Sequence, residues 1–213
     1  MKIKKLGHCC LFIETKDTKI VTDPGAWTDY PDTLPEVDII LITHEHQDHF
    51  HVPAIKEFLN VSPQAVVICN NSVAKLLHDE GITYEVMQDG SDKSFGDLHL
   101  EGYGKDHAEI YGEFGQVENT GFIIADELYY PGDGFFLPEK KVDILALPVA
   151  GSWLLIKEAI DFAKEYGAKK CFPVHDGMLR DDRRGPYHRV PKAVLEKEGI
   201  EFVELNAGEE VEL

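Results

Sequence analysis

The chain has 213 residues, 43% of them hydrophobic and 28% charged, and its formal net charge at pH 7 is −18. This length allows one large core, so we expect a single domain over residues 1–213. The negative charge argues against nucleic-acid enzymes, because lysine and arginine hold phosphate backbones. The sequence has no stretch approaching the roughly 20 apolar residues of a membrane span, so we also expect no membrane partner.

The amino-terminal segment and the cysteines predict a cytoplasmic protein. Gly7 and His8 interrupt the first apolar stretch and Glu14 ends it, which leaves it too short and too polar for a secretory signal. The cysteines lack zinc-type spacing, and we expect buried free thiols in a reducing compartment. They are Cys9, Cys10, Cys69 and Cys171.

Hydrophobic periodicity predicts strands and helices that alternate along the chain. In chain order we expect strands at 2–6, 9–14, 18–22 and 37–42, a helix at 52–59, a strand at 65–69, a helix at 72–80, strands at 97–103, 119–125, 127–130 and 143–147, a helix at 153–166, a strand at 169–174, a helix at 190–198 and a strand at 201–204. Gly167 is placed to cap the third helix. The pattern suggests an α/β fold with two sheets packed face to face and helices outside.

Three imidazoles and a carboxylate follow the expected strand at 37–42. They belong to His44, His46, Asp48 and His49. Zinc, manganese and iron accept these ligand types, and a catalytic site needs about three protein ligands and an open position for water. Residues 44 and 46 point the same way at a strand end and can share one metal, while the other two face a second. Surface-loop histidines are the alternative, which four adjacent ligand-type side chains disfavour.

The pattern H-x-H-x-D-H after an apolar strand resembles the metal-binding motif of the metallo-β-lactamase superfamily. That family also has an aspartate after an earlier strand, a later histidine, an aspartate in a Gly-Asp context and a final histidine near the end of the sheet. Residues of these types are Asp23, His107, Asp133 and His175. The resemblance implies an αββα four-layer sandwich with the metals at one edge.

The same resemblance implies a role for each residue and two divalent metal ions as cofactor, zinc first and manganese or iron as alternatives. Three residues would hold each metal: His44, His46 and His107 the first, and Asp48, His49 and His175 the second. Asp133 would bridge the metals, and Asp23 would support a ligating loop by hydrogen bonding. Asp48 would also act in catalysis by positioning the attacking hydroxide.

The segment Gly7-His8-Cys9 between two expected strands is similar to one branch of the superfamily, the metal-dependent hydrolases of the L-ascorbate-6-phosphate lactonase type. The resemblance implies hydrolysis of a small ester, lactone or related bond by metal-activated water. A phosphodiesterase is the alternative. A di-iron oxidoreductase is a further one, but His46 occupies the position where di-iron members have glutamate. A binding protein without turnover also stays open. His8 is either a turn residue near the metal cleft or a structural histidine, and we favour the structural role.

All arginines of the chain lie in one ten-residue window, from Arg180 to Arg189, just beyond His175. In one interpretation Arg180, Arg183 and Arg184, with His188, bind an anionic group of a small-molecule substrate near the metals. In the other, which we favour, the arginines pair with Asp176, Asp181 and Asp182 on a solvated loop, worth about 0 to 1 kcal/mol per pair. A homo-oligomer stays open. Trp153 is expected to pack against its helix rather than wall the site.

Overall fold

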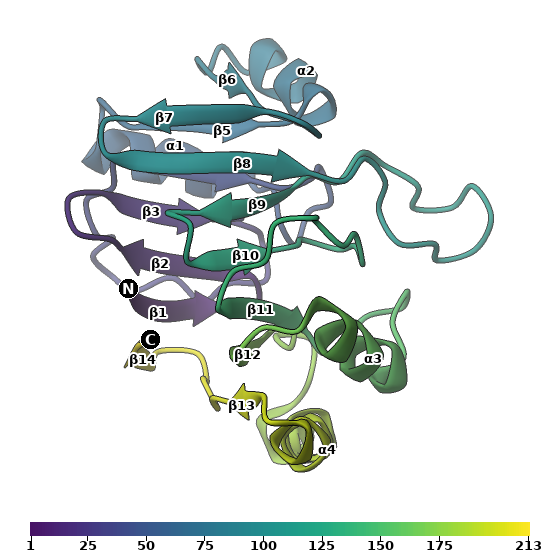
Figure 1. Ribbon diagram of the computed structural model, residues 1–213. Helices are drawn as coiled ribbons and strands as arrows, with labels where there is room; N and C mark the ends of the chain where they lie inside the picture. The colour runs from purple at the N-terminus through teal and green to yellow at the C-terminus, as the bar shows by residue number, and fades with distance from the viewer.

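The computed structural model describes the backbone of residues 1–213 and every side chain except that of Asp181. Two seven-stranded sheets pack face to face and carry helices on their outer surfaces (Figure 1). The first sheet has the order β14-β1-β2-β3-β4-β5-β6 and the second the order β13-β12-β11-β10-β9-β8-β7. This arrangement confirms the predicted four-layer α/β sandwich.

The elements follow the predicted alternation. The first sheet contains β1 (Lys2–Gly7), β2 (Cys10–Glu14), β3 (Lys19–Thr22), β4 (Ile39–Ile42), β5 (Val66–Cys69), β6 (Glu85–Val86) and β14 (Glu210–Glu212). The second contains β7 (Asp92–Phe95), β8 (Leu98–Tyr103), β9 (Gly121–Ile124), β10 (Leu128–Tyr130), β11 (Ile144–Pro148), β12 (Lys170–Val174) and β13 (Glu201–Phe202). The helices are α1 (Val52–Val61), α2 (Asn71–Asp79), α3 (Ile156–Tyr166) and α4 (Gly185–Leu195), with short 3-10 turns η1 (Asp181–Arg183) and η2 (Glu196–Glu198).

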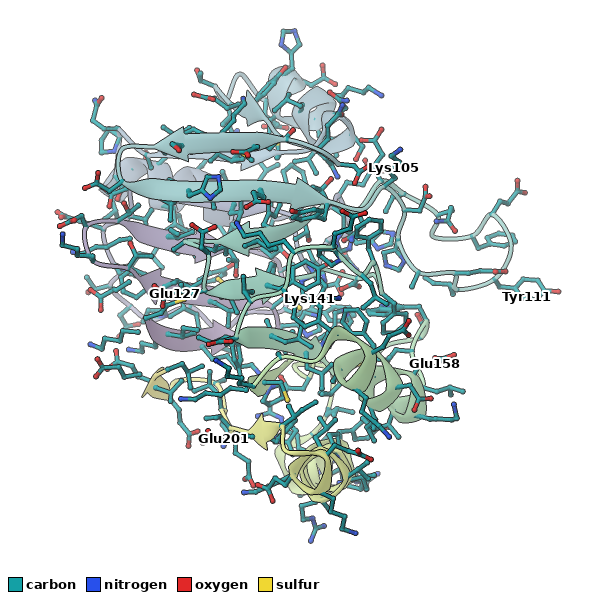
Figure 2. The ribbon with its side chains drawn as sticks, viewed as in Figure 1. Lys105, Tyr111, Glu127, Lys141, Glu158 and Glu201 are labelled. Carbon is teal, nitrogen blue, oxygen red and sulfur yellow. The ribbon has the colours of Figure 1, made fainter. Side chains whose placement is uncertain are left out.

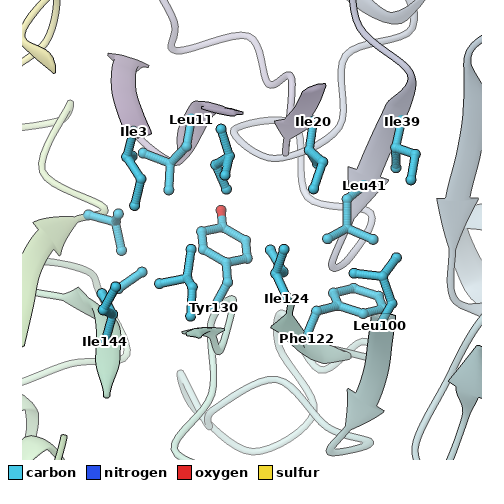
Figure 3. Packing of buried hydrophobic residues seen from close by; sticks show 14 of the residues in the cluster. Ile3, Leu11, Ile20, Ile39, Leu41, Leu100, Phe122, Ile124, Tyr130 and Ile144 are labelled. Carbon is cyan, nitrogen blue, oxygen red and sulfur yellow. The ribbon is translucent and has the colours of Figure 1, made fainter. Parts of the chain in front are cut away.

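Three apolar layers hold the sandwich together. Figure 3 shows the central layer, where Leu11 and Ile20 of the first sheet face Phe122 and Tyr130 of the second. A second layer fills the space between the second sheet and the helices α3 and α4, and a third lies between the first sheet and α1 and α2. The cysteines are buried free thiols, as expected. Burial of this apolar surface is the main force that fixes the two sheets against each other.

Parallel strands in the middle of each sheet determine where the loops meet. β3, β4 and β5 are parallel in the first sheet, and β10, β11 and β12 are parallel in the second. Open sheets place functional groups in the loops beyond the carboxyl ends of parallel strands. Every candidate metal ligand in this chain follows the carboxyl end of a strand.

Some element boundaries differ from the sequence prediction. α3 begins at Ile156 rather than 153, because the Glu158 side chain accepts a hydrogen bond from the backbone N–H of Leu155 and caps the helix there. α4 begins at Gly185 rather than 190, with a proline in its first turn. The predicted cap at Gly167 is confirmed, with φ of 75°. In the part of the chain that the structure describes, none of the helices has the length and apolar character to cross a bilayer.

Candidate metal centre

Loops at one edge of the sandwich bring the predicted ligands together in two groups. Within each group, the potential ligand atoms lie within 4.8 Å of one another. The first group is His44, His46 and His107, and the second is Asp48, His49, Asp133 and His175. The two groups contain the residues that the family resemblance implied for each metal, and Asp133 joins the second group. The strands that precede these residues belong to both sheets.

Asp133 lies between the two groups. Its Oδ2 is 3.3 Å from Nε2 of His107 in the first group and 2.9 Å from Nε2 of His175 in the second. Its Oδ1 is 3.1 Å from Nε2 of His49. The carboxylate therefore contacts both groups, which is the position that a bridging ligand requires.

Thr43 and Asp23 set the proton positions on two of the imidazoles. The Thr43 hydroxyl donates to Asp23 Oδ2 at 2.7 Å, so its oxygen accepts from Nδ1 of His44 at 3.0 Å. Asp23 Oδ2 also accepts from Nδ1 of His49 at 2.8 Å. Both rings thus hold a proton on Nδ1 and turn Nε2 toward the centre, as metal-binding histidines do. Asp23 occupies the supporting position expected from the sequence.

Backbone carbonyls set the same tautomer on the other two buried rings. Nδ1 of His107 donates to the carbonyl of Ala108 at 2.6 Å, and Nδ1 of His175 donates to the carbonyl of Ala150. Several polar atoms of the centre are buried and, despite their short distances to the Asp133 carboxylate, form no well-aligned hydrogen bond among the described residues. They are Nε2 of His44, His49, His107 and His175, and Oδ1 of Asp133. A buried polar atom left unpaired costs about 1 to 3 kcal/mol, and divalent cations bind this donor set, so the residues fit the metals implied by the family.

The electrostatics of the centre agree with this fit. Burial raises the pKa of the Asp133 carboxyl group, but His175 and His49 lower it further, so the carboxylate is ionised. Burial lowers the pKa of His49 and His175, while Asp133 raises it, and the increase prevails. Burial lowers the pKa of His44. Without a cation, protons on His49 and His175 balance the carboxylates, and a bound metal would displace them.

His8 lies beside the centre, a position that the sequence left open, although we favoured a structural role for it. The backbone N–H of Gly177 donates to His8 Nδ1 at 3.1 Å, so the ring proton is on Nε2, 3.2 Å from Asp48 Oδ2. A Cβ at position 177 would lie 2.9 Å from the Cβ of His8, so this contact needs glycine. The sequence signals for this position were the place of His8 directly after β1 and the Gly7-His8-Cys9 resemblance. Its partners Asp48 and Gly177 are distant in the chain, so the contacts themselves could not be predicted.

Three residues of the centre have left-handed backbone conformations. The φ angles are 34° at His8, 38° at Asp23 and 61° at His175. Such conformations cost about 1 to 3 kcal/mol each for residues with a side chain and persist only where the surrounding structure fixes them. In this protein they lie at strand ends, where they turn side chains toward the centre.

A cavity of about 270 Å³ opens over the centre. Besides the candidate ligands, its lining consists of Trp27, Gln47, Ile110, Ser152, Trp153 and Met178. The Trp153 ring lies 5.6 Å from that of His107 and 5.5 Å from that of His175, between ring centroids. Trp153 packs in the layer under α3 and also walls the cavity, so the expectation of packing alone was wrong.

The predicted substrate contacts do not gather at this cavity. Among the described side chains, neither the arginines Arg180, Arg183 and Arg184 nor His188 line it. Arg180 pairs with Asp182 at 3.1 Å, and Nε2 of the buried His188 lies 2.9 Å from Asp176 Oδ2. Because none of them lines the cavity, the hypothesis of an anion pocket loses its support, and the Arg180–Asp182 pair agrees with the favoured interpretation of ion pairs on the loop. The Asp181 side chain, a suggested arginine partner, lies outside the described residues.

Comparison with known proteins gives the family. Residues 2–175 match the family model described as "Beta-lactamase superfamily domain". The chain is 30% identical to "Protein Rv0786c" of Mycobacterium tuberculosis over 193 residues, 88% of this chain and 90% of that protein. It is 29% identical to the "UPF0173 metal-dependent hydrolase NEQ378" of Nanoarchaeum equitans over 227 aligned residues, 100% of both chains.

A solved structure has the same fold. Igni18, described as a metallo hydrolase from Ignicoccus hospitalis, superposes with a TM-score of 0.78 at 20% identity, covering 99% of this chain and 97% of that one. At this identity the likeness shows the fold alone. The family itself follows from the family model and from a further relative, since the chain is 31% identical to the "UPF0173 protein PYRAB01190" of Pyrococcus abyssi over 185 residues, 83% of this chain and 84% of that protein. The chain belongs to the metallo-β-lactamase superfamily and, within it, to the UPF0173 family.

Proposed function

We propose that the protein is a hydrolase that uses two divalent cations, zinc first, to cleave a small carboxylic ester or lactone. One observation carries the proposal: the unpaired Nε2 atoms of four buried histidines and an oxygen of Asp133 meet at one place. The name of the full-length relative from Nanoarchaeum equitans, a metal-dependent hydrolase, supports the reaction class. The first cation would be held by His44, His46 and His107, and the second by Asp48, His49 and His175, with Asp133 between them.

The protein groups then have separable tasks. Bound cations lower the pKa of a coordinated water to about 7 and polarise a carbonyl oxygen. Burial raises the pKa of the Asp48 carboxyl group, but the neighbouring His175 and His8 imidazoles lower it further, so this cavity-lining carboxylate is ionised. It would accept a hydrogen bond from the attacking water and orient it. Trp153, which lines the cavity beside His107 and His175, would exclude bulk water from one side of the reacting group.

The lining of the cavity favours an ester or lactone over a phosphodiester. Phosphate groups are recognised by arginine and lysine, and neither type lines the cavity within the described part of the chain. Lactone hydrolysis is also the chemistry of the branch that the Gly7-His8-Cys9 segment resembles. The di-iron alternative is disfavoured by His46, whose ring lies 4.7 Å from that of His107, between centroids, within the first ligand group.

Metal analysis followed by a substrate screen tests the proposal. We expect about two equivalents of metal per chain and, with that metal restored, turnover in a panel of lactones, esters, thioesters and phosphodiesters. His46→Ala should remove turnover and lower the metal content while circular dichroism shows a folded chain. His78→Ala, at an exposed histidine on α2, is the matched control and should retain both. A metal-free active protein, or an active His46→Ala variant, would refute the assignment.

A further inference from the structure

Large apolar side chains stay exposed around the opening of the cavity. The exposed fractions are 41% for Trp27, 37% for Ile110 and 45% for Met178, and all three line the cavity. These residues are far apart in the sequence and come together only in the fold. Apolar side chains gathered at one opening mark a site for an apolar ligand, whereas single exposed ones are common and need no explanation.

The loop between β8 and β9 carries more apolar surface beyond this opening. It projects from the sandwich in Figure 1, and Figure 2 shows Tyr111 near its far end. Its base is fixed, because the Gln116 side chain donates to the carbonyl of His107 at 2.7 Å. Ile110 of this loop reaches the cavity, while Tyr111 and Phe114 are 78% and 69% exposed. Ile110, one of the three apolar residues at the opening, therefore lies on the same loop as the candidate ligand His107.

Where the structure describes side chains, the remaining lining has no lysine or arginine that could pair with an anionic group of a substrate, so only the proposed metal ions could do so. Gln47 and Ser152 are neutral, and across the described residues no lysine or arginine side chain lines the cavity. The net charge of −18 also repels anions from the surface. The volume of about 270 Å³ lies just below the range usual for drug-sized ligands, so the cavity suits a small molecule.

We propose that the rim formed by Trp27, Ile110 and Met178 binds the apolar chain of an uncharged substrate, next to the bond that is cut. The substrate class is then a neutral ester or lactone that carries a short alkyl or acyl chain. This inference rests on the proposed hydrolase function for its reaction, but the rim can be tested by binding alone. It replaces the hypothesis of an anionic substrate held by arginines.

A series of straight-chain hydroxamic acids, from acetyl to hexanoyl, tests the rim on zinc-loaded protein by titration calorimetry. The hydroxamate group binds the metals in every member, so only the chain varies. We expect affinity to rise by up to about fourfold for each methylene removed from water. Succinic monohydroxamate, which ends in a carboxylate, should bind more weakly than butyrohydroxamate.

Two variants and a control locate the effect. Ile110→Ala and Met178→Ala should flatten the chain-length series while retaining metal content, since neither side chain is a candidate ligand. Leu76→Ala is the matched control, because Leu76 is an aliphatic residue on α2 with a similar exposed fraction, 39%, and lies outside the cavity. It should leave the series unchanged.

The outcomes separate this inference from the proposed function. A flat series, tighter binding of the carboxylate-bearing compound, or no binding by any member would overturn the apolar rim. A protein that shows the chain-length effect but hydrolyses no ester or lactone would keep the rim and lose the hydrolase assignment. Hydrolysis of esters without any chain-length effect on binding would keep the hydrolase assignment and overturn the apolar rim.

Discussion

Replacing Asp23 with asparagine tests how the centre fixes the proton of His49. Asp23 is fully buried, and its Oδ2 accepts from the Thr43 hydroxyl at 2.7 Å and His49 Nδ1 at 2.8 Å and lies 2.7 Å from the Tyr130 hydroxyl. Its Oδ1 accepts from the Thr43 backbone N–H at 2.7 Å. An asparagine that keeps this last bond turns an NH₂ group toward the other donors. His49 then has to accept at Nδ1 and carry its proton on Nε2, the atom that would bind the cation.

The expected loss falls on metal binding. Removing an outer hydrogen-bond partner of a metal-binding histidine lowers metal affinity by about 10 to 100-fold, or roughly 1.4 to 2.8 kcal/mol. Tyr130→Phe is the matched control, because it removes another hydroxyl from the same Asp23 oxygen and leaves the proton of His49 in place. It should lower the free energy of unfolding by about 0.5 to 1.5 kcal/mol, with little effect on metal affinity.

Competition with a chromophoric zinc chelator measures the affinity of the wild type and both variants, and thermal melts of the metal-free proteins measure their stability. Asp23→Asn should weaken zinc binding much more than Tyr130→Phe does. Equal weakening in the two variants would show that general loosening of the core, and not the proton position on His49, controls metal binding.

Three other predictions concern His8, His99 and the bound metals. His8→Ala should lower kcat about tenfold or more by releasing Asp48, and His8→Gln, whose amide can donate at the same place, should recover part of it at equal metal content; equal loss in both would contradict this role. Hydrogen bonds to Asp126 and Asp92 raise the pKa of His99, so its stabilisation is complete below about pH 6.5 and is lost as pH rises through the higher folded value. The Tm difference between wild type and His99→Gln should therefore shrink from about pH 5.5 to about pH 8.5, and a constant difference would refute the assignment. Chelation should lower Tm but leave the circular dichroism of the folded chain, because the apolar layers do not depend on metal; unfolding on chelation would show otherwise.

The sequence was most informative where ligands directly follow strands. His44 and His46 follow β4 and His175 follows β12, so strand prediction and ligand type indicated ligands at the ends of strands, which the fold brings to one edge of the sandwich. His107 could be proposed only from the family pattern, because it lies beyond β8 in a loop without periodicity. His8 could not be assigned, since its contact with Asp48 depends on a fold that joins residues 40 positions apart.

Neighbourhood along the chain left two interpretations open for the arginines, and the short strands gave little signal. Arg180, Arg183 and Arg184 are close in sequence, but their clustering did not reveal which way the chain leaves the sheet after β12. β6, β7 and β14 were not predicted, because they are short edge strands with few buried residues and therefore lack a clear period of two.

The left-handed backbone at His8, Asp23 and His175 sets stability against function at three positions. Glycine adopts this conformation without a steric penalty, so relief of strain there favours a more stable fold. It would also remove an imidazole or a carboxylate from the centre. A library selected for thermal stability alone should accumulate glycine at these positions, whereas a library selected for metal binding should retain the strained residues.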